Sequence, residues 1–146
     1  MSFDRDIYKR VVAAKMYIDD NLHEPMKLEQ VSQQACFSPF HFHKLFTRIY
    51  KKTPHEYLTQ VRIEAARRML GQKDTSVSQV CLNVGFESLG SFSTMFKKKN
   101  GVSPQAYRNT ALERLKAADI QPKAFIPHCV LNFHQGAEKQ DSRNGQ

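Results

Sequence analysis

Residues 28–57 open with Leu28-Glu29-Gln30-Val31 and close with Pro54-His55-Glu56-Tyr57, and residues 77–107 repeat this pattern from Val77-Ser78-Gln79-Val80 to Pro104-Gln105-Ala106-Tyr107. Three pairs match at an offset of 49: Val31 with Val80, Ala35 with Val84, and Phe37 with Phe86. After one inserted residue, four pairs match at an offset of 50: Phe42 with Phe92, Phe46 with Phe96, Pro54 with Pro104, and Tyr57 with Tyr107. A repeat of this length indicates two supersecondary units of one kind.

The composition is that of a small soluble globular protein. The 146 residues are 40% hydrophobic and 25% charged, enough for one domain or two very small ones. No apolar run is long enough to span a bilayer, and residues 1–6 lack the apolar core of a signal peptide, so we expect a cytoplasmic protein. The three cysteines have no paired spacing, which argues against a disulfide framework.

The positive charge is concentrated in the repeated part. The net charge is +8, and residues 117–146 contribute none of it, because their three basic and three acidic residues cancel. Residues 39–52 contain four Lys or Arg and no acid, and residues 88–101 contain three Lys and no acid. Positive charge at matching places in both repeats predicts a polyanionic partner, whereas a face kept basic only for solubility does not explain the match.

Apolar periodicity predicts an all-α fold of about seven helices: residues 6–22, 28–35, 39–50, 54–70, 77–84, 88–100 and 103–114. We expect two tandem helix-turn-helix subdomains joined by a long linker helix. Residues 1–71 form the first subdomain with the linker helix, residues 72–116 form the second, and residues 117–146 form a partly disordered tail. In that tail, Phe125-Ile126 and Cys129-Val130-Leu131 are candidates for a short strand or for packing on the body.

One helix of each unit has an apolar back and a polar front. In the first unit Phe42, Leu45, Phe46 and Ile49 form the core stripe, which leaves these residues outside: Phe40, Lys44, Thr47, Arg48 and Lys51, with His43 on the flank. In the second unit Phe92, Met95 and Phe96 form the stripe, and Gly90, Ser91, Thr94, Lys97 and Lys98 lie outside. Such helices fit the major groove of double-stranded DNA. Phe40 contacts either the core or the DNA, and the sequence leaves both open.

The expected length of the linker helix is close to the helical repeat of a DNA duplex. Its roughly 18 residues span about 27 Å, close to the ~34 Å turn of B-DNA. Both helices should therefore enter adjacent major grooves, so that a monomer reads an asymmetric site and bends the DNA. Arg62, Arg67 and Arg68 on this helix either touch phosphates or, as we favour for Arg62 and Arg68, are solvated charges that pair with Glu64.

The motifs resemble the DNA-binding domain of the AraC/XylS family of transcription regulators. The first unit shows Leu28-x-x-Val31-x-x-x-Ala35, Phe37-Ser38, and Pro54-x-x-Tyr57 followed by Arg62. The most specific marks are in the second unit: Val84-Gly85-Phe86-Glu87-Ser88, Phe92-x-x-x-Phe96-Lys97 and Gly101-Val102-Ser103-Pro104-x-x-Tyr107-Arg108. This resemblance implies a seven-helix, two-unit fold and a regulator, usually an activator, that contacts RNA polymerase.

The resemblance also assigns DNA-contacting positions. Base-reading positions are Phe40, His43 and Lys44 in the first unit, and Leu89, Gly90, Ser91 and Thr94 in the second. Leu89 and Gly90 have no side-chain hydrogen-bonding group, so our base-reading set is Phe40, His43, Lys44, Ser91 and Thr94. We assign Thr47, Arg48, Lys51, Lys97 and Lys98 to the DNA backbone. The first unit should thus specify sequence, and the second should mainly anchor on the backbone.

Other functions have less support. His41 and His43 point about 200° apart on a helix and cannot share one metal ion, and no catalytic constellation is evident, so we expect neither an enzyme nor a metal or cofactor. Glu87 should cap the following helix. The alternatives are a DNA-binding fragment of a larger effector-responsive regulator, and a non-catalytic adaptor that binds RNA or RNA polymerase. Against RNA binding, only Phe40 offers an outward aromatic platform.

Overall fold

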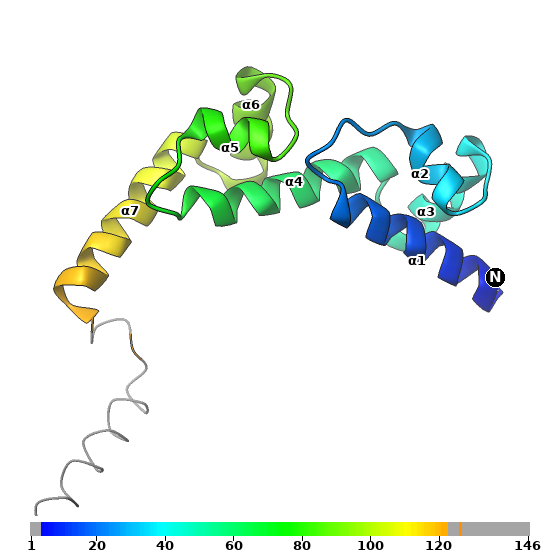
Figure 1. The fold of residues 1–146 in the computed structure, drawn as a ribbon, viewed down its shortest axis with the longest axis horizontal. Helices are drawn as coiled ribbons and strands as arrows, with labels where there is room; N and C mark the ends of the chain where they lie inside the picture. Colours follow the sequence, from blue (N-terminus) through cyan, green and yellow to red (C-terminus); the bar gives the residue numbers. More distant parts are fainter. Residues whose placement is uncertain (1–3, 123–125, 127–146) are drawn as a thin grey trace, which may run out of the picture. The chain divides into compact units, whose positions relative to one another are not determined.

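The computed structural model describes residues 4–122 and Ile126. Within these residues all regular secondary structure is helical, with no strand. The helices are α1 (Arg5–Asp20), α2 (Leu28–Gln34), α3 (Pro39–Tyr50), α4 (Pro54–Leu70), α5 (Val77–Asn83), α6 (Leu89–Asn100) and α7 (Pro104–Ile120) (Figure 1). The prediction of an all-α fold with seven helices is confirmed.

The chain divides into two compact units, residues 1–108 and residues 109–146. The first contains both helix-turn-helix motifs. The described part of the second consists of the later turns of α7, two residues that follow it, and Ile126. The strand or packing role expected for Phe125-Ile126 and residues 129–131, and the disorder expected for the tail, concern segments that lie almost wholly outside the described residues.

Short polar side chains start the helices at the places that the sequence indicates. The hydroxyl groups of Ser38, Thr53, Ser76 and Ser88 each accept a hydrogen bond from the backbone N–H three residues later. Each satisfies one of the N–H groups that a helix start leaves without an internal partner. At α4 the Glu56 carboxylate also accepts from the Thr53 N–H, at 2.8 Å, which completes a capping box.

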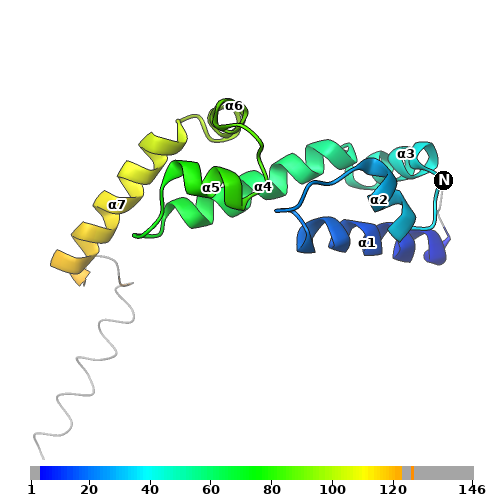
Figure 2. The ribbon, with the colours of Figure 1, turned by 45° about the horizontal axis from the view of Figure 1, so that its top comes forward.

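Each helix-turn-helix motif packs on its own apolar core. In the first core Val11, Ala14 and Ile18 of α1 meet Phe42 and Phe46 of α3. In the second, Ile63, Ala66 and Leu70 of α4 meet Phe92 and Phe96 of α6. In Figures 1 and 2, α3 lies near the start of α4 and α6 lies further along it. The four phenylalanines are fully buried, as their spacing predicts.

The internal repeat extends to α1 and α4. At an offset of 52, Arg10 matches Arg62, Val11 matches Ile63, Ala14 matches Ala66, and Ile18 matches Leu70. The three apolar pairs are buried in equivalent places of the two cores. The repeating unit is therefore a three-helix bundle, either α1–α2–α3 or α4–α5–α6.

Helix α4 contributes to both cores. Leu58, near its start, belongs to the first core, whereas Ile63, Ala65, Ala66 and Leu70 belong to the second. This helix is both the linker and the first helix of the second bundle. The boundary expected between residues 71 and 72 stays a prediction.

Two helix ends differ from expectation by more than one residue. Helix α1 ends at Asp20 rather than Leu22, and Asn21 closes it by donating from its backbone to the Tyr17 carbonyl. Helix α7 continues to Ile120, six residues beyond the expected Arg114. The added residues contain no Gly or Pro, so nothing stops the helix before Pro122, which disfavours helical geometry at the residue before it.

A polar contact joins α1 to α4. The Tyr57 hydroxyl donates to Asp19 Oδ1 at 2.7 Å, and Lys15 Nζ lies 2.6 Å from Asp19 Oδ2. Burial first, and then the hydrogen bond to Asp19, raise the pKa of Tyr57 to about 12. The hydrogen bond to Asp19 raises the pKa of Lys15, so this contact joins a cation, an anion and a neutral phenol.

Candidate nucleic-acid interface

The turn before α3 is held by an arginine of α1. Cys36 in this turn has φ = 54°, a conformation that glycine adopts readily and other residues rarely. Arg10 Nε donates to the Ala35 carbonyl at 2.8 Å, and its Nη2 donates to the Cys36 carbonyl. The same guanidinium lies 3.8 Å from the centre of the Phe37 ring. These contacts stabilise the turn.

Two of the predicted base-reading residues form one exposed group at the start of α3. The Phe40 side chain is 72% exposed, which rules out the core-contact alternative left open by the sequence. The Lys44 ammonium lies 4.6 Å from the centre of the Phe40 ring, within the range of a cation–π contact. An apolar ring and a cation are therefore presented to solvent together.

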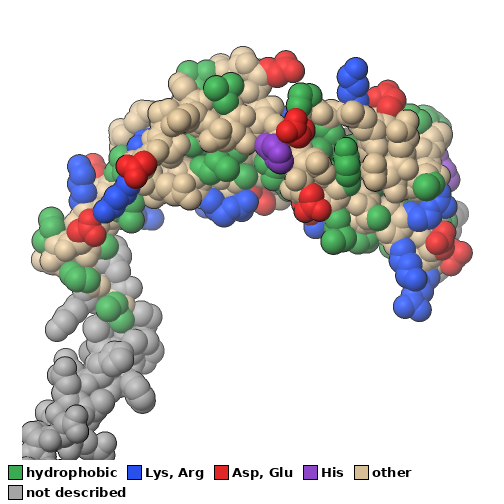
Figure 3. Space-filling view, viewed as in Figure 1, with side chains coloured by type: hydrophobic (Ala, Val, Ile, Leu, Met, Phe, Trp, Pro, Cys, Tyr) green, Lys and Arg blue, Asp and Glu red, His purple; other side chains and the backbone are tan. Residues whose placement is uncertain are grey.

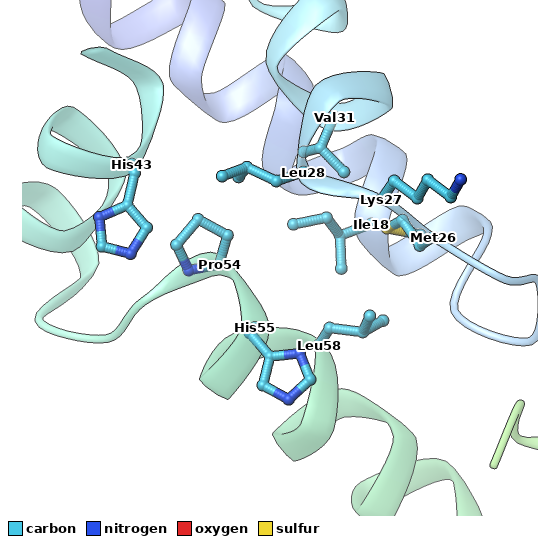
Figure 4. Close-up of a pocket in the computed structure, with 9 residues that line it drawn as sticks. All are labelled: Ile18, Met26, Lys27, Leu28, Val31, His43, Pro54, His55 and Leu58. Carbon is cyan, nitrogen blue, oxygen red and sulfur yellow. The ribbon is translucent and has the colours of Figure 1, made fainter. Parts of the chain in front are cut away.

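His43 lies to one side of that group, at a small apolar hollow. The hollow has a volume of about 130 Å³, and its walls include the buried side chains of Ile18, Val31 and Leu58. Figure 4 shows the imidazoles of His43, from α3, and of His55, from α4, on either side of Pro54. His43 is exposed, as a contact with DNA requires.

The predicted backbone contacts of the first unit differ in exposure. Arg48 and Lys51 are exposed, and Lys51 closes α3 in the left-handed conformation with φ = 59°. The Thr47 hydroxyl oxygen, in contrast, is buried and has no hydrogen-bond partner among the described residues. A phosphate contact through this hydroxyl would require the side chain to rotate.

The outward face of α6 carries the expected residues of the second unit. Ser91, Thr94, Lys97 and Lys98 are all exposed. The last turn of α6 contains Lys97, Lys98 and Lys99, where the negative end of the helix dipole favours cations. Ser88, not Glu87, caps α6, since its hydroxyl accepts from the Ser91 N–H at 3.2 Å. The capping role predicted for Glu87 is therefore wrong.

The sequence-based interpretation of Arg62 is also wrong. Its Nε donates to the Leu22 carbonyl at 2.6 Å and its Nη2 to the Glu24 carbonyl at 2.8 Å, so it is neither a solvated charge nor paired with Glu64. Glu64 instead accepts from Gln60 at 2.8 Å. The match between Arg10 and Arg62 was the signal available in the sequence, because a repeated arginine beside buried positions indicates a structural role.

Charge is mixed on the side of the molecule shown in Figure 3. Lys and Arg side chains alternate there with Asp and Glu over the described residues. Basic residues without any acid occur instead in α3 with the two lysines after it, and in α6 with the residues at its ends. Within the described residues no group of three His, Cys, Asp or Glu side chains is placed to hold a metal ion, and no helix is long and apolar enough to cross a membrane.

Comparison with known families supports this geometry. A helix-turn-helix domain family matches residues 31–110, more than half of the chain and both motifs. The chain belongs to the AraC/XylS family of DNA-binding domains. This AraC-type domain is similar to the DNA-binding domain of AdpA, a global transcriptional factor solved in complex with a target DNA. The TM-score is 0.68 at 28% identity, and the match covers 72% of this chain and 95% of that one.

Curated relatives are longer proteins. The AraC-type domain is 37% identical over 92 residues to the bifunctional transcriptional activator and DNA repair enzyme AdaA of Bacillus subtilis, which covers 63% of this chain and 44% of that protein. It is 33% identical over 95 residues to the regulatory protein PocR of Salmonella typhimurium, which covers 65% of this chain and 31% of that protein. The chain therefore spans less than half the length of these relatives.

Proposed function

We propose that this AraC-type domain is a sequence-specific double-stranded DNA-binding transcription regulator without enzymatic activity. One observation carries the proposal: a single compact unit holds two helix-turn-helix motifs, each with an exposed polar face on the second helix. Two such helices on one chain suit adjacent major grooves of a duplex, and α4, at 17 residues, spans about 26 Å. The similarity to a domain solved with its target DNA supports this assignment.

The two halves have different parts in recognition. In the first half Phe40, His43 and Lys44 read bases, with Phe40 against thymine methyl groups or sugars and Lys44 against guanine acceptors. Arg48 and Lys51 contact phosphates, and Thr47 does so after its side chain rotates. In the second half Ser91 and Thr94 offer only hydroxyls to the bases, and Lys97 and Lys98 bind phosphates. The first half therefore carries most of the sequence information.

The regulator binds DNA as a monomer, since its two motifs follow in tandem without two-fold symmetry. It acts in the cytoplasm as an activator that contacts RNA polymerase.

A second candidate function is that of the DNA-binding portion of a larger effector-responsive regulator. The observation that favours it is the length of the relatives, of which this chain matches 44% or less in the two cases described.

Selection of bound duplexes from a random pool tests the proposal. We expect an asymmetric site of about two helical turns, with more information in the half that the first motif reads. Short palindromic sites occupied by two molecules would contradict the monomer. Tighter binding to single-stranded RNA than to a duplex of the same length at moderate salt would contradict the function itself.

A further inference from the structure

A direct contact joins the two halves beside the linker helix. Arg62 projects from α4 and donates to the carbonyls of Leu22 and Glu24, which lie in the segment between α1 and α2. That segment follows the end of α1, where backbone carbonyls have lost their helical partners. Two hydrogen bonds from one planar guanidinium fix the segment in position and direction more firmly than one bond from a flexible amine.

The turn of the second motif closes on the same segment. A Cβ atom added to Gly85 would lie 2.8 Å from the Leu22 carbonyl oxygen, 3.0 Å from the His23 carbonyl oxygen and 3.0 Å from Arg62 Nη2. Real Cβ atoms do not approach backbone oxygens this closely, so the turn is in contact with the first half without a gap. Arg62, which projects from α4, thus lies against both the segment after α1 and the turn before α6.

A carboxylate lies near the arginine in this contact. Burial lowers the pKa of Arg62, and the nearby carboxylate of Glu87 opposes that shift. Arg62 and Glu87 also line one groove with Met26 and Ser91, so the contact adjoins a residue predicted to face the DNA. A change in this contact would therefore act close to the reading surface of α6.

Comparison with Arg10, the matching arginine of the first half, shows that of these two only Arg62 joins the two halves. Arg10 has the same place in the repeat but donates to Ala35 and Cys36, within its own helix-turn-helix turn. Arg62 donates across to the first half instead. The first unit thus uses the arginine at this position within its own turn, whereas Arg62 uses its hydrogen bonds to join the two halves.

We infer that Arg62 is a positioning residue that fixes the angle between α3 and α6 and thereby sets the half-site spacing that the protein accepts. The inference rests on the proposed function. Helix α4 alone is a single connection that permits bending and twisting between the halves. The contacts of Arg62 and of the Gly85 turn with the segment 21–25 form a second connection beside it, and two connections resist both motions.

The test compares spacing preference in matched variants. One base pair added between the half-sites rotates the second groove by about 34–36° and moves it 3.4 Å. On selected sites with one base pair added or removed, we expect the wild type to bind about tenfold or more weakly than at its preferred spacing. Arg62→Lys keeps the charge but loses the two-bond geometry, and its spacing penalty should fall to about threefold or less.

Arg10→Lys is the matched control. It weakens the corresponding arginine of the first turn, and we expect its spacing penalty to remain that of the wild type. Circular dichroism measures the helix content and the thermal unfolding of both variants and establishes that they are folded. A folded Arg62→Lys protein with the full wild-type penalty would overturn the inference.

A second measurement needs no DNA. Spin labels on Gln33 of α2 and Asn83 of α5, both exposed, report the distance between the two halves. We expect one narrow distance distribution in the wild type and a broader one in Arg62→Lys, whereas equal widths would overturn the inference. Because this readout is independent of binding, a wild type that binds no duplex would refute the proposed function without affecting the result for Arg62.

Discussion

Cys36 and Gly85 occupy the same position in the two helix-turn-helix turns, and both have positive φ, 54° and 86° respectively. The turn between the two helices of each motif therefore requires one residue with a left-handed backbone conformation. Glycine meets this need without strain in the second turn, whereas cysteine meets it at a conformational cost of about 1–2 kcal/mol in the first. The hydrogen bonds from Arg10 to the Ala35 and Cys36 carbonyls compensate for that strain.

Cys36→Gly should stabilise the protein. Relief of the left-handed strain exceeds the greater freedom of glycine in the unfolded chain, so we expect the free energy of unfolding to rise by about 0.5–1 kcal/mol. Urea denaturation measures the change. Gln33→Gly, at an exposed position within α2, is the control and should lower stability by about 1 kcal/mol. A destabilised Cys36→Gly variant would refute the strain.

Alanine should have opposite effects at two glycines. Gly85→Ala combines a positive φ with a close approach to the Leu22 carbonyl, and should destabilise by about 2 kcal/mol or more. Gly90→Ala meets nothing within 4 Å on helix α6, and should stabilise by about 0.5–1 kcal/mol. Thermal unfolding of the two variants under the same conditions checks this. Equal effects would show that the Gly85 contact is not rigid.

Phe40 and Phe46, six residues apart on α3, should differ sharply in their contribution to stability. Phe46 is fully buried, and Phe46→Ala should cost about 3–5 kcal/mol. Phe40 is 72% exposed, and Phe40→Ala should leave stability within about 0.5 kcal/mol of the wild type. Chemical denaturation gives both values. Near-native stability of the Phe46 variant would overturn the core assignment.

Lys44→Ala tests base reading. If Lys44 reads a base beside Phe40, specific binding should weaken by about 1–3 kcal/mol and base preference should relax at one position. Fluorescence anisotropy on the selected site and on its single-base variants measures both effects. The same loss on random DNA would mean that Lys44 contacts only phosphate.

Lys97→Ala and Lys98→Ala test the backbone contacts of the second half. Each should reduce the slope of log K against log salt by about 0.9 and leave base preference unchanged, because a phosphate contact releases a counterion irrespective of sequence. Lys9→Ala, an exposed lysine of α1, is the control and should keep the wild-type slope. An unchanged slope in the α6 variants would remove these lysines from the interface.

Local patterns in the sequence were sufficient to predict the helices. Phe42 and Phe46, like Phe92 and Phe96, are buried because their spacing places them on one side of a helix. Ser38 and Thr53 start helices because their hydroxyls satisfy local backbone N–H groups. Both effects act over a few residues, so they do not depend on how distant segments pack.

Some side chains depend on tertiary contacts that periodicity does not specify. A helical wheel gives the direction of Arg62 and Thr47 from the helix axis, but not which segment lies against that side of the helix. The segment after α1 lies against α4 and gives Arg62 two carbonyl partners, while neighbouring atoms bury the Thr47 hydroxyl. Phe40 stays exposed because none of the described helices packs over the start of α3.

The sequence by itself determined the seven described helices, the buried phenylalanines of the two motifs and the concentration of positive charge on α3 and α6, since these follow from residue type and spacing. Only the tertiary structure decided which carbonyls Arg62 binds and how closely Gly85 approaches the first half. The physical reason is that such contacts join residues 38 or more positions apart, and their partners are selected by the packing of the whole unit.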